Sequence, residues 1–163
     1  MTICVCSDSH GNKHGIRIML EQEQPDALLF CGDGLDDLKG QKLPGKWAAV
    51  KGNCDYFCSE PDLYQDNWAG VELLMVHGHR YSVKRTEDIY LSEAFGRGAK
   101  VALYGHTHYQ KASWHAGVLL LNPGTMSRYN EYYAVLTFEN GMCTDCQLKR
   151  LMPRFGDEAL REL

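Results

Sequence analysis

This sequence lacks an excess of positive charge, a long hydrophobic run and a basic leader. Its 17 Lys and Arg residues are outnumbered by 21 Asp and Glu residues, which gives a formal net charge of −4. Tight binding to long nucleic acid needs cations that neutralise many phosphates, so this balance disfavours it. No apolar stretch approaches the ~20 residues of a membrane span. We therefore expect a soluble, unprocessed protein without membrane contact.

The cysteines argue against a disulfide framework. There are seven of them, an odd number, and several lie inside apolar runs, where Cys behaves as a small buried hydrophobe. This usage predicts a reducing, cytoplasmic compartment. Cys143 and Cys146 form the only C-x-x-C, and no second pair is present to complete a structural zinc site.

The overall composition of the chain is that of an ordinary globular protein. The 163 residues are 44% hydrophobic and 23% charged, and no segment is repetitive or of low complexity. A chain of this length fits one domain, 1–163, and buries roughly two thirds of its unfolded surface. We see no domain boundary.

The first two thirds of the chain alternates strands with helices. Apolar runs typical of buried strands cover residues 3–6, 27–31, 47–50, 71–76 and 101–104, and the last strand is expected to start at residue 100. Asn12 can cap a helix over 13–24, Thr86 can cap a second over 86–96, and a short helix is expected at 35–38. The segment 56–70 has no regular pattern before the next strand begins. The first strand, helix and second strand form a β-α-β unit, which predicts parallel strands.

Beyond residue 109 the pattern changes to antiparallel strands joined by short turns. These strands are expected at 112–115, 118–122, 132–139 and 142–151. Asn140-Gly141 is a clear hairpin turn. Two packed sheets with helices outside are therefore predicted. The charged tail 157–163 is expected to be a frayed helix and is a candidate for contacts in a homo-oligomer.

Five polar clusters follow five of these apolar runs. They are Asp8-Ser9-His10, Gly32-Asp33, Gly52-Asn53-Cys54-Asp55, His77-Gly78-His79 and Gly105-His106-Thr107-His108. One such cluster alone is more often a turn, a cap or a satisfied core residue. Five in series, supplying only hard or borderline metal donors at the edge where open α/β sheets bind ligands, indicate a dinuclear metal site.

The donors can be counted against two ions. Asp8 and His10 project to the same side of an extended turn, Asp33 can bridge two ions, and Asn53 offers a neutral amide oxygen. Nitrogen donors of the kind preferred by Zn, Mn, Fe or Ni come from His77, His106 and His108. These seven donors fill two tetrahedral shells only if Asp33 is shared. Two such ions, roughly 3.5–4 Å apart, would acidify a bridging water and clamp phosphate oxygens, which predicts phosphoester hydrolysis by in-line attack of hydroxide.

In order and spacing, these motifs resemble those of the calcineurin-like metallophosphoesterases. The resemblance extends from residue 2 to about residue 148, and the lack of a cap domain is similar to the small YfcE-type phosphodiesterases. It implies an α/β fold, a four-layer α-β-β-α sandwich of two mixed sheets, and two divalent ions, with Mn favoured over Zn, Fe or Ni. It also implies two ligand sets: Asp8, His10, Asp33 and His108 for one metal, and Asp33, Asn53, His77 and His106 for the other.

Asn53, Cys54 and His79 are the candidate catalytic residues. Many members of the resembling family carry His where this chain has Cys54, and that imidazole binds phosphate or protonates the leaving group. A thiol can donate a proton but lacks the charge of an imidazolium, so we expect diesters or good leaving groups to be favoured over unactivated alkyl monoesters. The alternative is that Cys54 only packs beside the site.

Three neighbouring features are expected to support the metal site. His79 either contacts the substrate phosphate or orients His77. Asp55 is expected to brace the Asn53 turn by accepting backbone N–H groups. The segment 122–125, Asn-Pro-Gly-Thr, reads as a turn, and a similar segment lies near the metal centre in the resembling subgroup.

The function favoured by these observations is metal-dependent hydrolysis of a small phosphodiester. One alternative is a non-catalytic scaffold, because a retromer subunit uses this fold with an impaired metal site. Another is a phosphomonoesterase or nuclease that uses the same site. A nuclease needs a basic track for its polymer, and the sequence has no such track.

Overall fold

Alternate residues of the central strands point to opposite sides, and both sides are buried. In β1 (Thr2–Cys6), Ile3 and Val5 pack into the core between the two sheets, whereas Cys4 and Cys6 pack into a second core beneath a helix. This explains why the strand reads as a continuous apolar run, as expected for a sheet covered on both faces.

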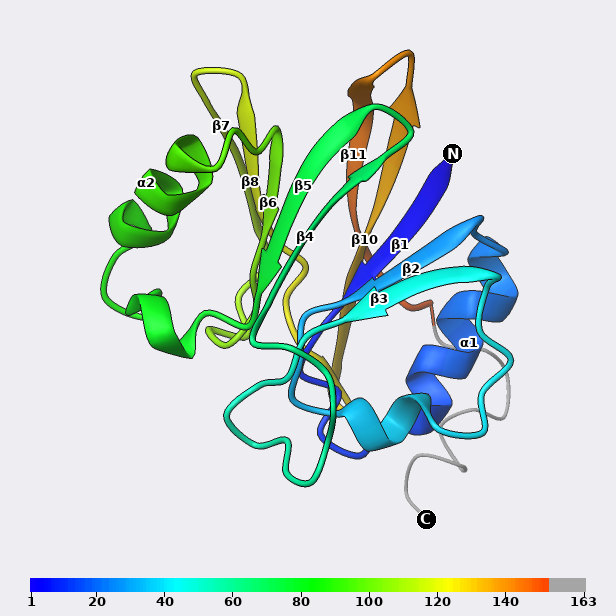
Figure 1. Cartoon of the computed structure of the whole chain (residues 1–163). Helices are drawn as coiled ribbons and strands as arrows, with labels where there is room; N and C mark the ends of the chain where they lie inside the picture. The colour runs from blue at the N-terminus through cyan, green and yellow to red at the C-terminus, as the bar shows by residue number, and fades with distance from the viewer. Residues whose placement is uncertain (153–163) are drawn as a thin grey trace.

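The computed structural model describes residues 1–152 as two mixed sheets packed face to face, with one α-helix outside each (Figure 1). The first sheet has the order β11 (Met142–Arg150), β10 (Asn130–Glu139), β1, β2 (Ala27–Phe30) and β3 (Lys46–Ala49), with β9 (Met126–Ser127) paired to β10. The second has the order β4 (Leu63–Trp68), β5 (Val71–Val76), β6 (Val101–Leu103), β8 (Val118–Asn122) and β7 (Lys111–His115). The four-layer α-β-β-α sandwich is confirmed.

The helices cover the outer faces of the sheets. Helix α1 (Lys13–Glu23) packs on the first sheet, and its cap is as expected, because Asn12 Oδ1 accepts the N–H of Gly15 at 3.1 Å. Helix α2 (Asp88–Gly96) packs on the second sheet. Two 3₁₀ helices complete the elements: η1 (Leu35–Leu38), at the predicted position, and η2 (His79–Tyr81), which was not predicted.

Two of the differences from the sequence prediction have a clear physical reason. The segment expected to be irregular contains the strand β4, whose residues are largely polar because it lies at the edge of its sheet and its outer face meets solvent. Helix α2 begins at Asp88 rather than at Thr86, because the Thr86 hydroxyl accepts the N–H of Asp88 at 3.2 Å and so precedes the first turn. The predicted hairpin at Asn140-Gly141 is present, with positive φ at both residues.

The topology brings the ends of several parallel strands together. Strands β1, β2 and β3 run parallel in the first sheet, as do β5, β6 and β8 in the second. Their carboxyl ends point toward the same edge of the sandwich, where the chain passes into loops (Figure 1). Among the described residues, no helix is long and apolar enough to cross a bilayer. The predicted tail helix at 157–163 lies outside the described residues.

Candidate metal centre

Five of the seven predicted metal ligands have a left-handed backbone. The φ angles are 52° at Asp8, 44° at His10, 61° at Asp33, 70° at His106 and 68° at His108. Such angles are uncommon outside glycine, although Asp and His adopt them more readily than most residues, and each costs on the order of 1–2 kcal/mol. They recur here because each loop must turn sharply where its strand ends. The strain is therefore concentrated at this sheet edge.

The first donor group consists of Asp8, His10 and His108, whose donor atoms lie within 4.8 Å of one another. Asp8 Oδ1 is 3.3 Å from His108 Nε2 and 3.6 Å from His10 Nε2. The two Nε2 atoms lie 3.3 Å apart. A carboxylate oxygen and two imidazole nitrogens thus face one point, the arrangement that holds a divalent transition-metal ion.

The second donor group consists of Asp33, His77 and His106, again within 4.8 Å of one another. His77 Nε2 is 3.2 Å from Asp33 Oδ2. Its other ring nitrogen, Nδ1, donates to the carbonyl of Cys31 at 2.8 Å. A carbonyl can only accept, so the proton is on Nδ1 and the lone pair of Nε2 faces the site.

Asp33 lies between the two groups. Its Oδ2 is 3.2 Å from His77 Nε2 in the second group and 4.0 Å from His10 Nε2 in the first. Its Oδ1 accepts the backbone N–H of Cys54 at 2.8 Å. One oxygen is therefore fixed by the protein, and the other is directed to the space that both groups share.

Two buried atoms of the site fit a bound cation. Asp8 Oδ1 and His77 Nε2 are buried and have no hydrogen-bond partner within residues 1–152. The second oxygen of Asp8, Oδ2, is satisfied by the Ser7 hydroxyl at 2.5 Å and the N–H of His106 at 3.0 Å. An unpaired buried polar atom costs about 1–3 kcal/mol, and a cation bound at each donor group would remove that cost.

The protonation states of Asp33 and His106 also suit a metal site. Burial raises the pKa of Asp33, but His77 and the Cys54 N–H outweigh it and lower the pKa to about 2, so the carboxylate is ionised. Burial and the neighbouring His77 lower the pKa of His106 to about 4, which keeps that imidazole neutral and able to donate its lone pair. For His77 itself burial lowers the pKa, but Asp33 and Asp8 raise it overall.

Asp55 braces the site as expected. Its carboxylate accepts four backbone N–H groups, from Asp33 at 2.7 Å, Gly34 at 3.0 Å, Leu35 at 3.1 Å and Gly52 at 2.8 Å. One side chain therefore joins the loop after β2 to the loop after β3. This fixes the backbone from which Asp33 projects.

Glycines next to the ligands leave room for the carboxylates. A Cβ at Gly52 would collide with Asp33 Oδ1, and a Cβ at Gly105 would collide with Ser7 Oγ and lie 2.6 Å from Asp8 Oδ2. Larger residues at either position would displace a carboxylate from the site.

The segment 122–125, expected by resemblance to lie near the metal centre, supports the candidate ligands through contacts that the sequence did not reveal. Thr125 Oγ1 donates to the carbonyl of Asp8 at 2.7 Å, and Asn122 Nδ2 donates to the carbonyl of Gly105 at 3.1 Å. The segment 122–125 thus supports the loops of both donor groups, beyond acting as a turn. Its polar residues directly after an apolar strand were the available signal, because buried polar side chains require partners.

A second support that the sequence did not reveal is buried beside His10. Asp37 Oδ2 accepts the Ser9 hydroxyl at 2.6 Å and the N–H of Gly11 at 2.9 Å. Asp37 lies in η1, well separated in sequence from the loop that it holds. Only the packing of η1 against that loop identifies its role.

The three candidate catalytic residues lie at the rim of the donor groups. Asn53 is exposed, and its amide Nδ2 lies 3.5 Å from Cys54 Sγ, so its role as a metal ligand stays a prediction. Cys54 Sγ lies within 4.8 Å of donor atoms of His10 and Asp33, which places the thiol at the site. The ring of His79 is 5.4 Å from that of His77. Because His77 is already oriented by Cys31, His79 is not needed for that purpose.

The fold and the two donor groups together define a metallophosphoesterase-type sandwich. The family model described as the calcineurin-like phosphoesterase superfamily domain matches residues 1–141, and the chain belongs to this family. It is 30% identical to YsnB of Bacillus subtilis, named as a probable metallophosphoesterase, over 100% of this chain and 95% of the relative.

Solved structures share the fold. One is an archaeal phosphodiesterase, with a TM-score of 0.74 and 23% identity over 93% of this chain and 100% of that chain. Another is Vps29 from Entamoeba histolytica in complex with Zn²⁺, with a TM-score of 0.73 and 16% identity over 93% of this chain and 98% of that chain. At these identities the likeness concerns the fold.

Proposed function

We propose that this metallophosphoesterase hydrolyses a small phosphodiester with two divalent ions, Mn favoured. The observation that carries the proposal is the pair of donor groups with Asp33 between them. Asp8, His10 and His108 would hold one ion, and His77, His106 and Asn53 the other, with Asp33 shared. Bound there, the ions would supply hydroxide at neutral pH and stabilise charge on the phosphate oxygens.

The chain's own residues favour a diester over a monoester. Burial, and after it the charge of Asp33, raises the pKa of the Cys54 thiol, so the thiol is uncharged at neutral pH. An uncharged group matches the single negative charge of a diester better than the two charges of a monoester. The thiol can also donate a proton to the departing oxygen. The shared fold of the archaeal phosphodiesterase supports the same choice.

The test is metal removal and restoration. Purified protein would be stripped with a chelator, reloaded with Mn²⁺, Zn²⁺, Fe²⁺ or Ni²⁺, and assayed with bis-p-nitrophenyl phosphate and p-nitrophenyl phosphate. We expect loss of activity on stripping, restoration with Mn²⁺, two ions per chain by elemental analysis, and a preference for the diester.

Other outcomes would assign other functions. A preference for p-nitrophenyl phosphate would make the protein a phosphomonoesterase, and efficient cleavage of oligonucleotides a nuclease. Metal-loaded protein that is inert toward every ester would contradict the enzymatic proposal and favour the non-catalytic scaffold.

A further inference from the structure

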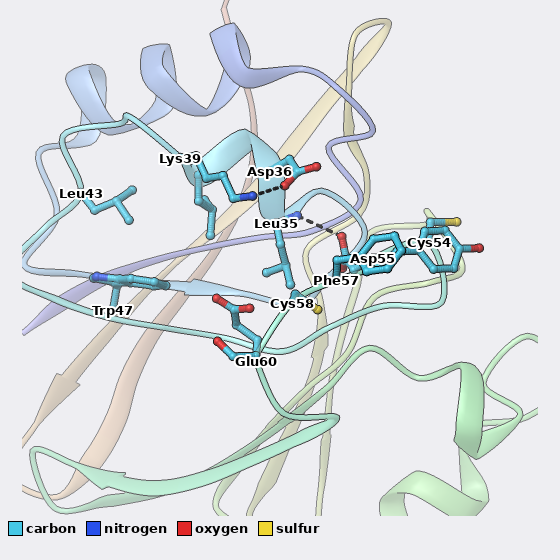
Figure 2. Close-up of a pocket in the computed structure, with 13 residues that line it drawn as sticks. Leu35, Asp36, Lys39, Leu43, Trp47, Cys54, Asp55, Phe57, Cys58 and Glu60 are labelled. Atoms are coloured by element: carbon cyan, nitrogen blue, oxygen red, sulfur yellow. Dashed lines mark hydrogen bonds and ion pairs between the residues drawn. The ribbon is translucent and has the colours of Figure 1, made fainter.

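A cavity of about 560 Å³ opens beside the metal centre (Figure 2). This volume falls within the ~300–1,000 Å³ of small-molecule sites. The cavity lies between η1, the start of β3 and the loop that follows Asn53. Cys54 lines the cavity, and its Sγ also lies within 4.8 Å of donor atoms of His10 and Asp33. The cavity and the metal centre are therefore continuous through one residue.

Aromatic side chains form much of its wall. Trp47 is 44% exposed, although it lies in a strand, and Tyr56 and Phe57 are more exposed still. Figure 2 shows Trp47 at the end of the cavity away from Cys54, with the ring of Phe57 at the end near it. Phe57 has a φ of 54°, a conformation that is rare for a bulky residue and that costs free energy unless the surroundings impose it. Exposed rings around an open cavity are typical of sites that stack a planar ligand.

The charges of the lining disfavour a second anionic group. Lys39 is the only cation of the lining, and its Nζ is 2.7 Å from Asp36 Oδ1. Glu60 adds a further carboxylate, whereas the Asp55 carboxylate is occupied by backbone N–H groups. The lining therefore carries net negative charge, and a neutral ligand is favoured over a phosphorylated one.

We propose that this cavity binds an uncharged aromatic group, of the size of a nucleobase or an aryl ring, on the ester arm that stays attached to phosphorus. The inference rests on the proposed phosphodiesterase function. The cavity opens at Cys54, beside the donors His10 and Asp33 that would hold the ions to which the phosphate binds. In-line attack puts the leaving oxygen opposite the attacking hydroxide, so the arm that remains projects sideways from phosphorus, and the cavity is assigned to that arm.

The experiment compares two diesters that release the same product. The p-nitrophenyl esters of methyl phosphate and of thymidine 5′-phosphate both release p-nitrophenolate, so the ratio of their kcat/KM values isolates recognition of the retained arm. We expect the metal-loaded protein to prefer the thymidine ester about tenfold. Phe57→Ala and Trp47→Ala should each lower that ratio severalfold. Trp114→Ala removes an exposed tryptophan of β7 outside the cavity and should leave the ratio unchanged.

Each outcome decides between the two proposals. Equal hydrolysis of both esters by the wild type, or an equal loss of both in the variants, would overturn the aromatic subsite and leave the phosphodiesterase function standing. No hydrolysis of either ester by metal-loaded wild type would overturn the function and the subsite with it. Phe57→Leu keeps the apolar bulk of the side chain without its ring. If the alanine variants fail to fold, this variant should show the same fall in the ratio of kcat/KM values.

Discussion

The carboxylate of Asp55 accepts the backbone N–H of Asp33 at 2.7 Å. This bond joins the loop after β3 to the residue that lies between the two donor groups. With its three further N–H partners, Asp55 fixes the backbone around Asp33, and its own carboxylate is occupied by these N–H groups.

Asp55→Asn should weaken the site through the backbone. The amide keeps one acceptor oxygen and turns an NH₂ group toward backbone donors, so we expect a loss of about 1–3 kcal/mol in unfolding free energy and a lower metal content. Thermal unfolding and elemental analysis measure the two effects. Asp145→Asn, an exposed change in β11, is the control and should alter neither. Full metal content in Asp55→Asn would refute the bracing role.

Asp33→Asn should abolish the shared position. The substitution keeps the size of the side chain but removes its negative charge, so we expect about one ion per chain in place of two and a fall in kcat of roughly 100-fold or more. Elemental analysis and turnover of bis-p-nitrophenyl phosphate measure this. Retention of both ions and full turnover would remove Asp33 from the mechanism.

Cys54→His should change how the rate depends on the leaving group. An imidazole donates a proton more readily near neutral pH than a thiol does, so esters with poor leaving groups should gain most. The measurement is kcat/KM across diesters of graded leaving-group pKa, with Cys54→Ser as the matched control. An identical slope in wild type and Cys54→His would mean that Cys54 only packs beside the site.

His79→Gln should act on substrate rather than on metal. His77 is already held by the Cys31 carbonyl, and His79 lies outside both donor groups. We expect KM for bis-p-nitrophenyl phosphate to rise severalfold while metal content stays at the wild-type level. Loss of an ion in this variant would instead show that His79 supports His77.

Glu23 should contribute stability that disappears in acid. Its carboxylate accepts the Tyr133 hydroxyl at 2.5 Å and Lys149 Nζ at 2.8 Å, joining α1 to β10 and β11. Burial raises the pKa of Glu23, but Lys149 and Tyr133 outweigh it and lower the pKa below the usual 4.5. A lowered folded pKa gives stability that is present above the unfolded pKa and is lost as the pH falls through the folded value.

The matching experiment is chemical unfolding of Glu23→Gln across pH. The variant should be about 1 kcal/mol less stable at pH 7, and the gap to wild type should close in strong acid. The exposed Glu139→Gln at the end of β10 is the control and should show no such convergence. A gap that is constant with pH would contradict an ionised role for Glu23.

The amino-acid pattern was sufficient for the layers and for placing most candidate ligands at one edge of the sheets. Runs such as Val71–Val76 are apolar on both faces apart from Glu72, so they had to lie between two layers. Polar residues directly after them, such as His77, had to lie at the sheet edge. Strand β4 escaped prediction because an edge strand with one exposed face needs few apolar residues.

The sequence by itself determined which residues are present at the carboxyl edge of the sheets, because strand periodicity and parallel topology bring those strand ends together. Only the tertiary structure decided how their atoms face one another. Three features of the site depend on contacts between segments far apart in the chain. They are the left-handed turns at Asp8 and His106, the hydrogen bonds that Asp55 accepts from backbone N–H groups, and the cavity between Trp47 and Phe57. Such contacts have no local sequence period, since they are fixed by packing and by the need to pair buried polar groups.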